Sequence, residues 1–366
     1  MIILLTIPGL ILLSFLKGQC RESILSKGKW TFIIGISVVI TTLVSIILLL
    51  LRFLNVYIIM SLYGSAGLGR LLWMVFKGDG FPTIKKLLPD LRSSWGLVIL
   101  LFIAGILFFQ PTEYYIGGRD PGVYVNAAVN MAKTGQIMKK DPLINQVKED
   151  YPEVFETNTH KYAGFYIETR DGETWINPQF YHGYTAWLAL GYQWLGENWF
   201  LYITPLLGLI SIMVMYRSVG ELVNERVGFI TAALLTINIS QIWYARGPYT
   251  EILSQLLLWF SIYLLIKAQM FKNPLLALVA GLAIGATILV RLDNILILLP
   301  LALYLVYNYL KDNQSYRTWI KYIIGSLALC AFIFFVYAYQ YGREYTHFQL
   351  IRETPIPDEL SLSVLF

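Results

Sequence analysis

Long apolar runs separated by short polar segments dominate the chain and predict a bundle of membrane-spanning helices. A helix needs about 20 apolar residues, within a range of roughly 17 to 25, to cross the hydrocarbon core of a bilayer. Ten runs are candidate spans: 2–16, 30–51, 53–76, 95–110, 199–217, 227–244, 249–267, 274–290, 292–310 and 319–341. The first and the fourth run are short. The pattern predicts an all-α polytopic membrane protein with about ten transmembrane helices.

The basic residues predict which side of the membrane each connecting segment faces. If the N-terminus is outside, the five inner segments together hold 15 Lys or Arg residues. These segments are 17–29, 77–94, 217–226, 267–273 and 311–321. The short outer turns hold only Arg52, Arg246 and Arg291. Because cytoplasmic loops carry the excess of Lys and Arg, residues 111–198 and the chain from Gly342 onward are predicted to be extracytoplasmic.

Composition agrees with this interpretation. The chain is 57% hydrophobic and 14% charged, whereas a soluble domain carries about a quarter charged residues. The net charge of +5 lies in short clusters between apolar runs, which is typical of membrane orientation rather than of nucleic-acid binding. Cys20 and Cys330 are far apart in or beside apolar runs, so they predict no disulfide or metal framework. No basic residue precedes the first apolar run, which favours a retained span over a signal peptide.

The long loop, residues 111–198, has the pattern of a folded unit. A helical pattern opens at Asp120-Pro121 and stops at Gly135, with Asp suited to the N-cap, Pro to the first turn and Gly to the C-terminal stop. Its apolar face is formed by Val123, Ala127, Ala128 and Met131. We expect this helix to lie along the membrane surface.

Two further elements are expected in the loop. The stretch FYIETRDGETWIN predicts a small β-hairpin that turns at Asp171-Gly172. The aromatic-rich segment 180–196 predicts a second surface helix or a shallow re-entrant one, because Tyr and Trp favour the headgroup level. The chain then divides into three parts: N-terminal helices with a basic loop (1–94), a transmembrane core (95–341), and a tail (342–366).

Two acidic residues at the predicted outer side are candidates for catalysis. Asp120 follows the fourth span, beside Arg119, where its carboxylate could take a proton from an acceptor hydroxyl. The alternative is a plain N-cap. Glu251 begins the seventh span after Thr250, and the alternative there is an acid favoured by the helix dipole by roughly 0.3–1 kcal/mol. Both acids are predicted to face the same side of the membrane.

Nearby residues are candidates for substrate binding. Arg119 and Arg246 could bind phosphate through their guanidinium groups, or they could simply anchor helix ends at the interface. Tyr124 and Tyr249 lie close in sequence to the two acids. His182 could relay protons near neutral pH, or pack as a structural residue among its aromatic neighbours.

Arg291 and Asp293 form a tight turn between the eighth and ninth spans. They could pair with each other or approach the same cavity as the acids, and the pair is favoured. The sequence has no His and Cys cluster for a catalytic metal, no Walker A loop, no dinucleotide-binding fingerprint and no GxSxG motif. Because the candidate acids face outward, a nucleotide-sugar donor is disfavoured and a sugar carried by a polyprenyl phosphate fits better.

Four segments together carry a family resemblance: GGRDPGVYVNAAVNMAKTGQI, INPQFYHGYTAWLALGYQWLG, YARGPYTEILSQLLLW and GATILVRLDNILILLPL. By their order and spacing, residues 95–310 resemble the membrane-embedded glycosyltransferases of the GT-C class, which includes protein mannosyltransferases and the aminoarabinose transferase of lipid A. In this resemblance Asp120 matches the family's catalytic acid and Glu251 a second acidic position. The chain departs from the family in lacking the adjacent Asp-Glu pair of protein mannosyltransferases and in carrying three spans before the core.

The resemblance implies an inverting sugar transfer from a polyprenyl-phosphate carrier to a lipid, glycan or protein acceptor at the outer face of the cell membrane. Asp120 would act as base, Arg246 or Arg119 would stabilise the leaving phosphate, and Glu251 would position a substrate. No cofactor is identified with certainty. A divalent cation at Asp120 is an open alternative, although one carboxylate alone is a poor site. The rival hypotheses are a transporter or flippase for a lipid-linked substrate, with acids near the bilayer midplane, and a non-catalytic membrane subunit.

Overall fold

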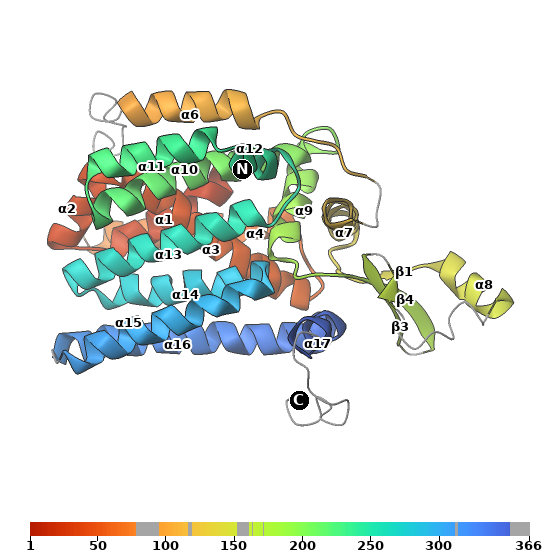
Figure 1. Ribbon diagram of the computed structural model, residues 1–366. Helices are drawn as coiled ribbons and strands as arrows, with labels where there is room; N and C mark the ends of the chain where they lie inside the picture. Colours follow the sequence, from red (N-terminus) through yellow and green to blue (C-terminus); the bar gives the residue numbers. More distant parts are fainter. Residues whose placement is uncertain are drawn as a thin grey trace.

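The computed structural model describes residues 1–77, 95–115, 119–151, 161–162, 164–170, 172–311 and 314–351. Long helices lie side by side in a bundle, and a small unit with a β-sheet projects from one end of it (Figure 1). We call this the loop end of the bundle. Residues 78–94, which make up nearly all of the predicted basic loop, lie outside the described ranges, as do residues 352–366 of the tail.

The bundle is formed by apolar helices from both halves of the chain. Its helices are α1 (Ile2–Phe15), α2 (Gly18–Lys27), α3 (Lys29–Leu50), α4 (Val56–Lys77), α6 (Trp95–Phe108), α10 (Ile203–Leu222), α11 (Glu225–Ile237), α12 (Ile239–Arg246), α13 (Glu251–Phe271), α14 (Pro274–Val290), α15 (Leu298–Leu310) and α16 (Gln314–Tyr337). The core runs through α10, α13, α14 and α16, which pack in that order, while α3 contacts α10, α13 and α14. The predicted N-terminal part is therefore packed on the core.

Glycines allow two of these helices to approach closely. A Cβ atom at Gly9 of α1 would overlap the backbone of Ile33 in α3. The amide of Gly9 donates a hydrogen bond to Ser37 Oγ of α3 at 3.0 Å. Small residues at helix contacts are how membrane helices gain packing energy without a hydrophobic driving force between them. The first, short apolar helix is held against the bundle in this way.

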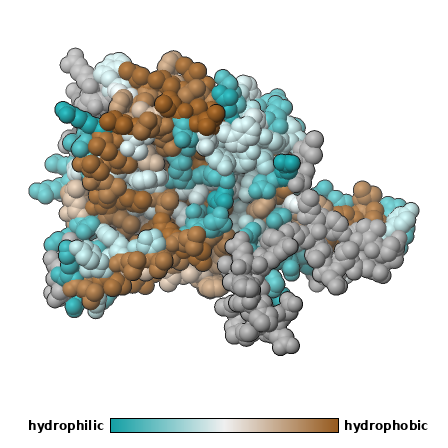
Figure 2. Space-filling view, viewed as in Figure 1, coloured by the Kyte–Doolittle hydropathy of each residue, from teal (hydrophilic) through white to brown (hydrophobic). Residues whose placement is uncertain are grey.

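Length and composition support a multi-pass membrane protein. Among the described residues, six helices are long and apolar enough to cross a membrane, and a seventh span is obtained if α11 and α12, bent by 64°, are taken together. Three shorter apolar helices are α1, α6 and α14. Figure 2 shows hydrophobic residues covering much of the visible side of the bundle. Each predicted span coincides with an apolar helix, but the count of ten and the orientation stay predictions.

The loop unit contains more structure than the sequence predicts. Its elements are α7 (Asp120–Thr134), β1 (Lys139–Lys140), α8 (Pro142–Asp150), β2 (Lys161–Tyr162), β3 (Phe165–Arg170), β4 (Glu173–Pro178) and α9 (Gly183–Leu195). The sheet has the order β1-β4-β3-β2, and its neighbours are antiparallel. Strands β3 and β4 pair with Arg170 opposite Glu173 around Gly172, which has φ 78°, where the hairpin is predicted. Asp171 lies outside the described residues, and α8, β1 and β2 were not anticipated.

Helices α7 and α9 lie across the loop end of the bundle, since both run transverse to its long helices in Figure 1. Helix α9 is buried from Gly183 to Gly191 between α7 and the bundle, and Trp187 donates a hydrogen bond to Thr42 of α3 at 2.9 Å. The aromatic residues of this segment, expected at the headgroup level, are thus largely enclosed by protein.

The sheet is fastened to the end of α16. There the chain continues through a π-helical turn, η4 (Ala338–Gly342), into α17 (Arg343–Ile351). Arg170 of β3 donates to the carbonyl of Gln340 at 2.6 Å, and Asn177 of β4 donates to that of Tyr341 at 2.8 Å. The start of the predicted tail is therefore helical and part of the loop end.

Candidate functional site

Asp120 stands at the start of α7, at the loop end of the bundle. The N-cap is Arg119, with extended backbone (φ −129°, ψ 154°), so the prediction that Asp120 caps the helix is wrong by one residue. Asp120 is instead the acid of the first turn, followed by Pro121, and its side chain is exposed. Gly135 ends the helix in the left-handed region (φ 72°), as predicted. The helix dipole favours a carboxylate in the first turn without requiring the side chain as a cap, which leaves it free to meet a ligand.

Glu251, Arg291 and Asp293 form one charged cluster. Arg291 reaches Glu251 at 2.5 Å through one guanidinium nitrogen and Asp293 at 2.8 Å through another. It also donates to the hydroxyl of Thr250 at 3.2 Å. The predicted pairing of Arg291 with Asp293 is observed, and Glu251, expected as a helix-start acid, is part of the same network. The side chains of Glu251 and Arg291 are about one third exposed (35% and 33%), so a ligand can still approach them.

The short helix after Arg291 is pinned in place by one amide. This is η3 (Leu292–Ile297), a 3₁₀ segment that joins α14 to α15. Asn294 donates to Ser254 Oγ of α13 and to the carbonyl of Thr287 of α14, both at 2.8 Å. These bonds fix the turn from which Arg291 and Asp293 project.

Tyr124 connects Asp120 with the charged cluster. Its ring is buried one turn into α7, and burial raises the pKa of the Tyr124 hydroxyl well above its usual value, with the negative charge of Asp120 adding to the rise. A hydrogen bond with Thr250 opposes the rise, and Glu251 contributes to it. One phenol thus lies within electrostatic reach of both acids, which come from helices more than a hundred residues apart in the chain.

Aromatic side chains pack around Tyr124. The ring of Tyr124 lies 5.2 Å from that of Phe180 and 5.7 Å from that of Tyr184, and Phe180 lies 5.4 Å from Tyr345 of α17. Tyr345 is within electrostatic range of Asp120, Arg291 and Asp293. Tyr345 was not predicted as a site residue, because the chain from Gly342 onward was predicted to be a tail. The helical spacing of aromatic and aliphatic residues in REYTHFQLI was the available signal.

Arg246 and Tyr249 lie between the acids and α6. Arg246 donates from Nε to the carbonyl of Leu107 at 2.7 Å, and its own carbonyl accepts from the amide of Thr112 at 2.9 Å. The ring of Tyr249 contacts that of Tyr114 at 6.5 Å. Burial raises the pKa of the Tyr249 hydroxyl, and Glu251 adds a smaller effect. These contacts attach the segment that leads toward Asp120.

His182 occupies a closed position. Its side chain is 1% exposed, and its Nδ1 contacts the hydroxyl of Tyr337. Burial lowers the pKa of His182 to about 3, so the imidazole is neutral near pH 7. This placement favours the structural alternative over proton relay. Within the described ranges, no three His, Cys, Asp or Glu side chains lie close enough together to hold a metal ion, and the cation shared by Glu251 and Asp293 is Arg291.

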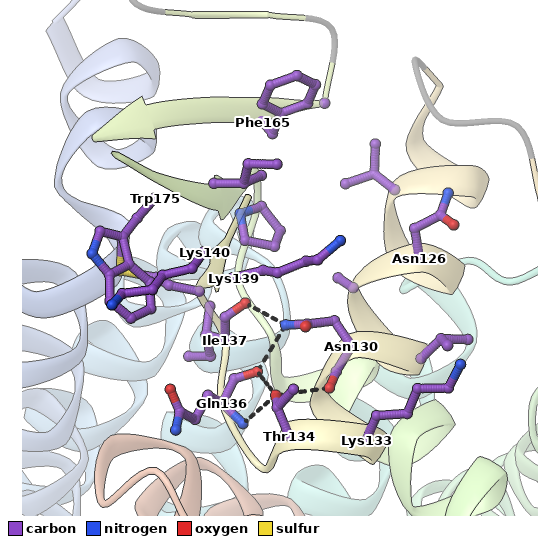
Figure 3. Close-up of a pocket in the computed structure, with 17 residues that line it drawn as sticks. Asn126, Asn130, Lys133, Thr134, Gln136, Ile137, Lys139, Lys140, Phe165 and Trp175 are labelled. Atoms are coloured by element: carbon purple, nitrogen blue, oxygen red, sulfur yellow. Dashed lines mark hydrogen bonds between the residues drawn. The ribbon is translucent and has the colours of Figure 1, made fainter. Parts of the chain in front are cut away.

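Two hollows lie near the cluster. An apolar groove of about 470 Å³ is formed by the loop-end halves of α14, α15 and α16, with Ile288, Ile295 and Phe334 among its lining residues. In the chain, Arg291 lies between α14 and η3, and both of these elements contribute residues to the lining of the groove. A larger cavity of about 1090 Å³ lies between α7 and the sheet (Figure 3). The acids line neither hollow, and the lysines of the larger cavity were not singled out from the sequence.

Comparison with known proteins identifies a family for part of the chain. No curated protein and no solved structure matches it. Residues 185–338 match the family model described as dolichyl-phosphate-mannose-protein mannosyltransferase. The matched stretch includes Glu251, Arg291 and Asp293, whereas Asp120 precedes it. The match confirms the resemblance to membrane glycosyltransferases of the GT-C type over residues 185–338, which are less than half of the chain.

Proposed function

We propose that the protein transfers a sugar from a polyprenyl-phosphate carrier to an acceptor at the extracytoplasmic face of the membrane. The observation that carries this proposal is that Asp120 and Glu251 both lie within electrostatic reach of Tyr124, while Arg291 pairs with Glu251. In the chain, Arg291 stands between Ile288 and Ile295, which line an apolar groove. A lipid phosphate has a hydrocarbon chain and an anionic head. The groove suits the chain, and a guanidinium at its end suits the phosphate.

The proposed reaction is a single displacement with inversion. An acceptor hydroxyl attacks the anomeric carbon while the bond between that carbon and the phosphate oxygen breaks. The acceptor proton passes to Asp120, and the bonding electrons leave with the polyprenyl phosphate. Arg291 stabilises the charge that grows on the phosphate, with Arg119 and Arg246 as further candidate ligands. Such fixed charges, in a site with little water, commonly make the largest contribution to catalysis.

Glu251 has a positioning role in this proposal. It orients Arg291 through the 2.5 Å ion pair, while Asp293 holds a second guanidinium nitrogen of Arg291 at 2.8 Å. The two acids hold the planar guanidinium in one orientation. Less side-chain entropy is therefore lost when it binds a phosphate. Tyr249, which is half-buried, supplies a surface against which a sugar can pack.

The transporter hypothesis retains one supporting observation. Helices α11 and α12 are bent by 64° at Asn238, and interrupted helices are typical of transporters. The acids, however, stand at helix starts rather than at mid-helix positions. A transporter would move a lipid-linked sugar across the vesicle membrane without cleaving it. This movement would be unchanged when Asp120 is replaced.

The test is replacement of Asp120 by Asn. Removal of a general base typically lowers the rate by about 10²- to 10⁴-fold. We expect D120N to lose transfer of radiolabelled mannose from dolichyl-phosphate mannose to acceptors in membranes that contain the protein. The matched control is D150N, the same change at the exposed end of α8. Full transfer by a folded D120N protein would end the proposal.

A further inference from the structure

The cavity between α7 and the sheet has no role in the reaction above. It measures about 1090 Å³, slightly above the range of roughly 300–1,000 Å³ for small-molecule pockets. One face of α7 forms one wall and β1, β3 and β4 form the other (Figure 3). It is therefore large enough for a substrate rather than a few waters.

The walls are mainly apolar and firmly held. Val123 and Ala127 of α7 face Phe165 and Ile176 of the sheet across the cavity. Asn130 donates to the carbonyls of Gln136 and Ile137, at 3.1 and 3.0 Å, and thereby fixes the turn that leads from α7 to β1 (Figure 3). A pre-formed apolar surface of this kind suits a ligand with a hydrocarbon or sugar-ring face.

The charged residues that line the cavity are all lysines. They are Lys133, Lys139 and Lys140. Lys139 lies 3.6 Å from Asp141, Lys140 pairs with Glu173, and both acids lie outside the lining. In Figure 3 Lys139 extends between the strands and α7, whereas Lys140 lies against Trp175. Lys133 is in the last turn of α7, where the helix dipole already favours a cation. The lining thus carries positive charge beside its apolar surface.

Asp120 lies on α7 close to the first residue that lines the cavity. The α7 residues in its wall recur at helical spacing from Val123 to Thr134, and Asp120 precedes Val123 by three residues. At a rise of about 1.5 Å per residue this is about 4.5 Å along the helix axis. A ligand that lies along α7 can therefore place a reactive group beside the proposed base while most of its surface stays in the cavity.

We infer that this cavity binds the acceptor, and that the acceptor is an anionic amphiphile carrying a phosphate or carboxylate beside an apolar or sugar face. The inference rests on the proposed function, because the ligand in the cavity would supply the hydroxyl that attacks the sugar. The lysines attract the anion, the aromatic and aliphatic wall covers the rest, and the groove beyond Arg291 is left to the donor. A polypeptide acceptor without negative charge would make no use of the positive charge that the lysines bring to the lining.

The test measures binding of a fluorescent lysophosphatidic acid to the purified full chain in a neutral detergent. Its uncharged control is the monoacylglycerol with the same chain and fluorophore. We expect the anionic probe to bind at least tenfold more tightly than the uncharged one, and K133Q/K139Q to weaken it at least tenfold. K133R/K139R should retain binding, and K17Q, the same change at an exposed position outside the cavity, should stay within twofold of the parent.

Several results would overturn the inference. Equal binding of the two probes, or unchanged binding by K133Q/K139Q, would remove the anionic class. Displacement of the probe by inorganic phosphate alone would assign the lysines to free phosphate, and displacement by an uncharged peptide would assign the cavity to polypeptide. D120N separates the two proposals, since it should abolish transfer but retain probe binding. If D120N loses transfer but the parent protein does not bind the probe, the acceptor role of the cavity is wrong and the proposed function is retained.

Discussion

The two ends of α13 carry ion pairs of the same chemistry in different surroundings. At the loop end, Glu251 binds Arg291, and both side chains are about one third exposed. Near the opposite end, Lys267 binds Glu221 at 2.8 Å, with Lys267 2% and Glu221 17% exposed. The sequence alone gives no reason to treat one as a site and the other as structure, since each is an acid and a base at a helix end.

The difference lies in what else can reach the charges. The ammonium of Lys267 lies 5.8 Å from the ring centroids of both Tyr263 and Phe271, and 3.4 Å from Ser23 Oγ, so protein encloses it. Arg291 is shared by two acids and is about one third exposed. A closed pair contributes to the fold, whereas an open one can exchange part of its contacts for a ligand. The comparison predicts that activity depends on the open pair and stability on the closed one.

The largest effect is expected on activity at the open pair. R291Q should lower sugar transfer by about 10²- to 10³-fold, the typical result of removing one donor that stabilises transition-state charge. Stability should change little, because partly exposed ion pairs contribute about 0–1 kcal/mol. The measurement is transfer from dolichyl-phosphate mannose, with R226Q at an exposed position of α11 as control. Transfer at the parent rate would remove Arg291 from the mechanism.

The next effect is expected on stability at the closed pair. E221Q leaves Lys267 buried without its partner and should destabilise the protein by about 3 kcal/mol, since breaking a buried pair costs roughly 3–5 kcal/mol. Transfer per folded molecule should not change. E225Q, at a 55% exposed acid, should cost less than about 1 kcal/mol. Thermal unfolding in detergent gives the comparison, and E221L/K267M should recover most of the loss. An E221Q protein as stable as the parent would contradict the assignment.

A further effect is expected from His182, on the pH dependence of stability. Its folded pKa of about 3 lies below the ordinary value of 6.5, so the unfolded chain binds the proton more readily. The contribution of neutral His182 is complete above pH 6.5 and declines as the pH falls toward 3, by up to about 1.4 kcal/mol per unit. Between pH 7 and pH 4, the free energy of unfolding should therefore fall less steeply with pH in H182Q than in the parent. H347Q, at an exposed position in α17, serves as control, and parallel curves for H182Q and the parent would refute the expectation.

Much of the fold could be predicted from local patterns. Apolar runs located the long helices, Pro121 and Gly135 bounded α7, and the alternation around Gly172 located two strands. What failed depended on tertiary contacts. The burial of α9 depends on its contacts with α7 and α3, which are distant in the sequence. The N-cap of α7 was predicted at Asp120, one residue after its position at Arg119.

The candidate site was predictable in its parts but not in its assembly. Chemistry and position suggested Asp120, Glu251 and Arg291 one by one, and the turn spacing suggested the pair of Arg291 with Asp293. No local signal shows that Tyr124 lies within reach of both acids, or that Tyr345 returns to the same place. Both facts depend on α7 crossing the end of the bundle, which is a property of the whole fold.

Cross-linking tests most directly whether the two acids converge. Asp120→Cys and Glu251→Cys would be combined in a chain in which Cys20 and Cys330 are replaced by Ser, and treated in membranes with a short bifunctional thiol reagent. We predict an intramolecular cross-link between positions 120 and 251, detected by mass spectrometry, and none when Glu225→Cys, near the other end of the bundle, replaces Glu251→Cys. Efficient labelling of both cysteines without a link between 120 and 251 would contradict the account.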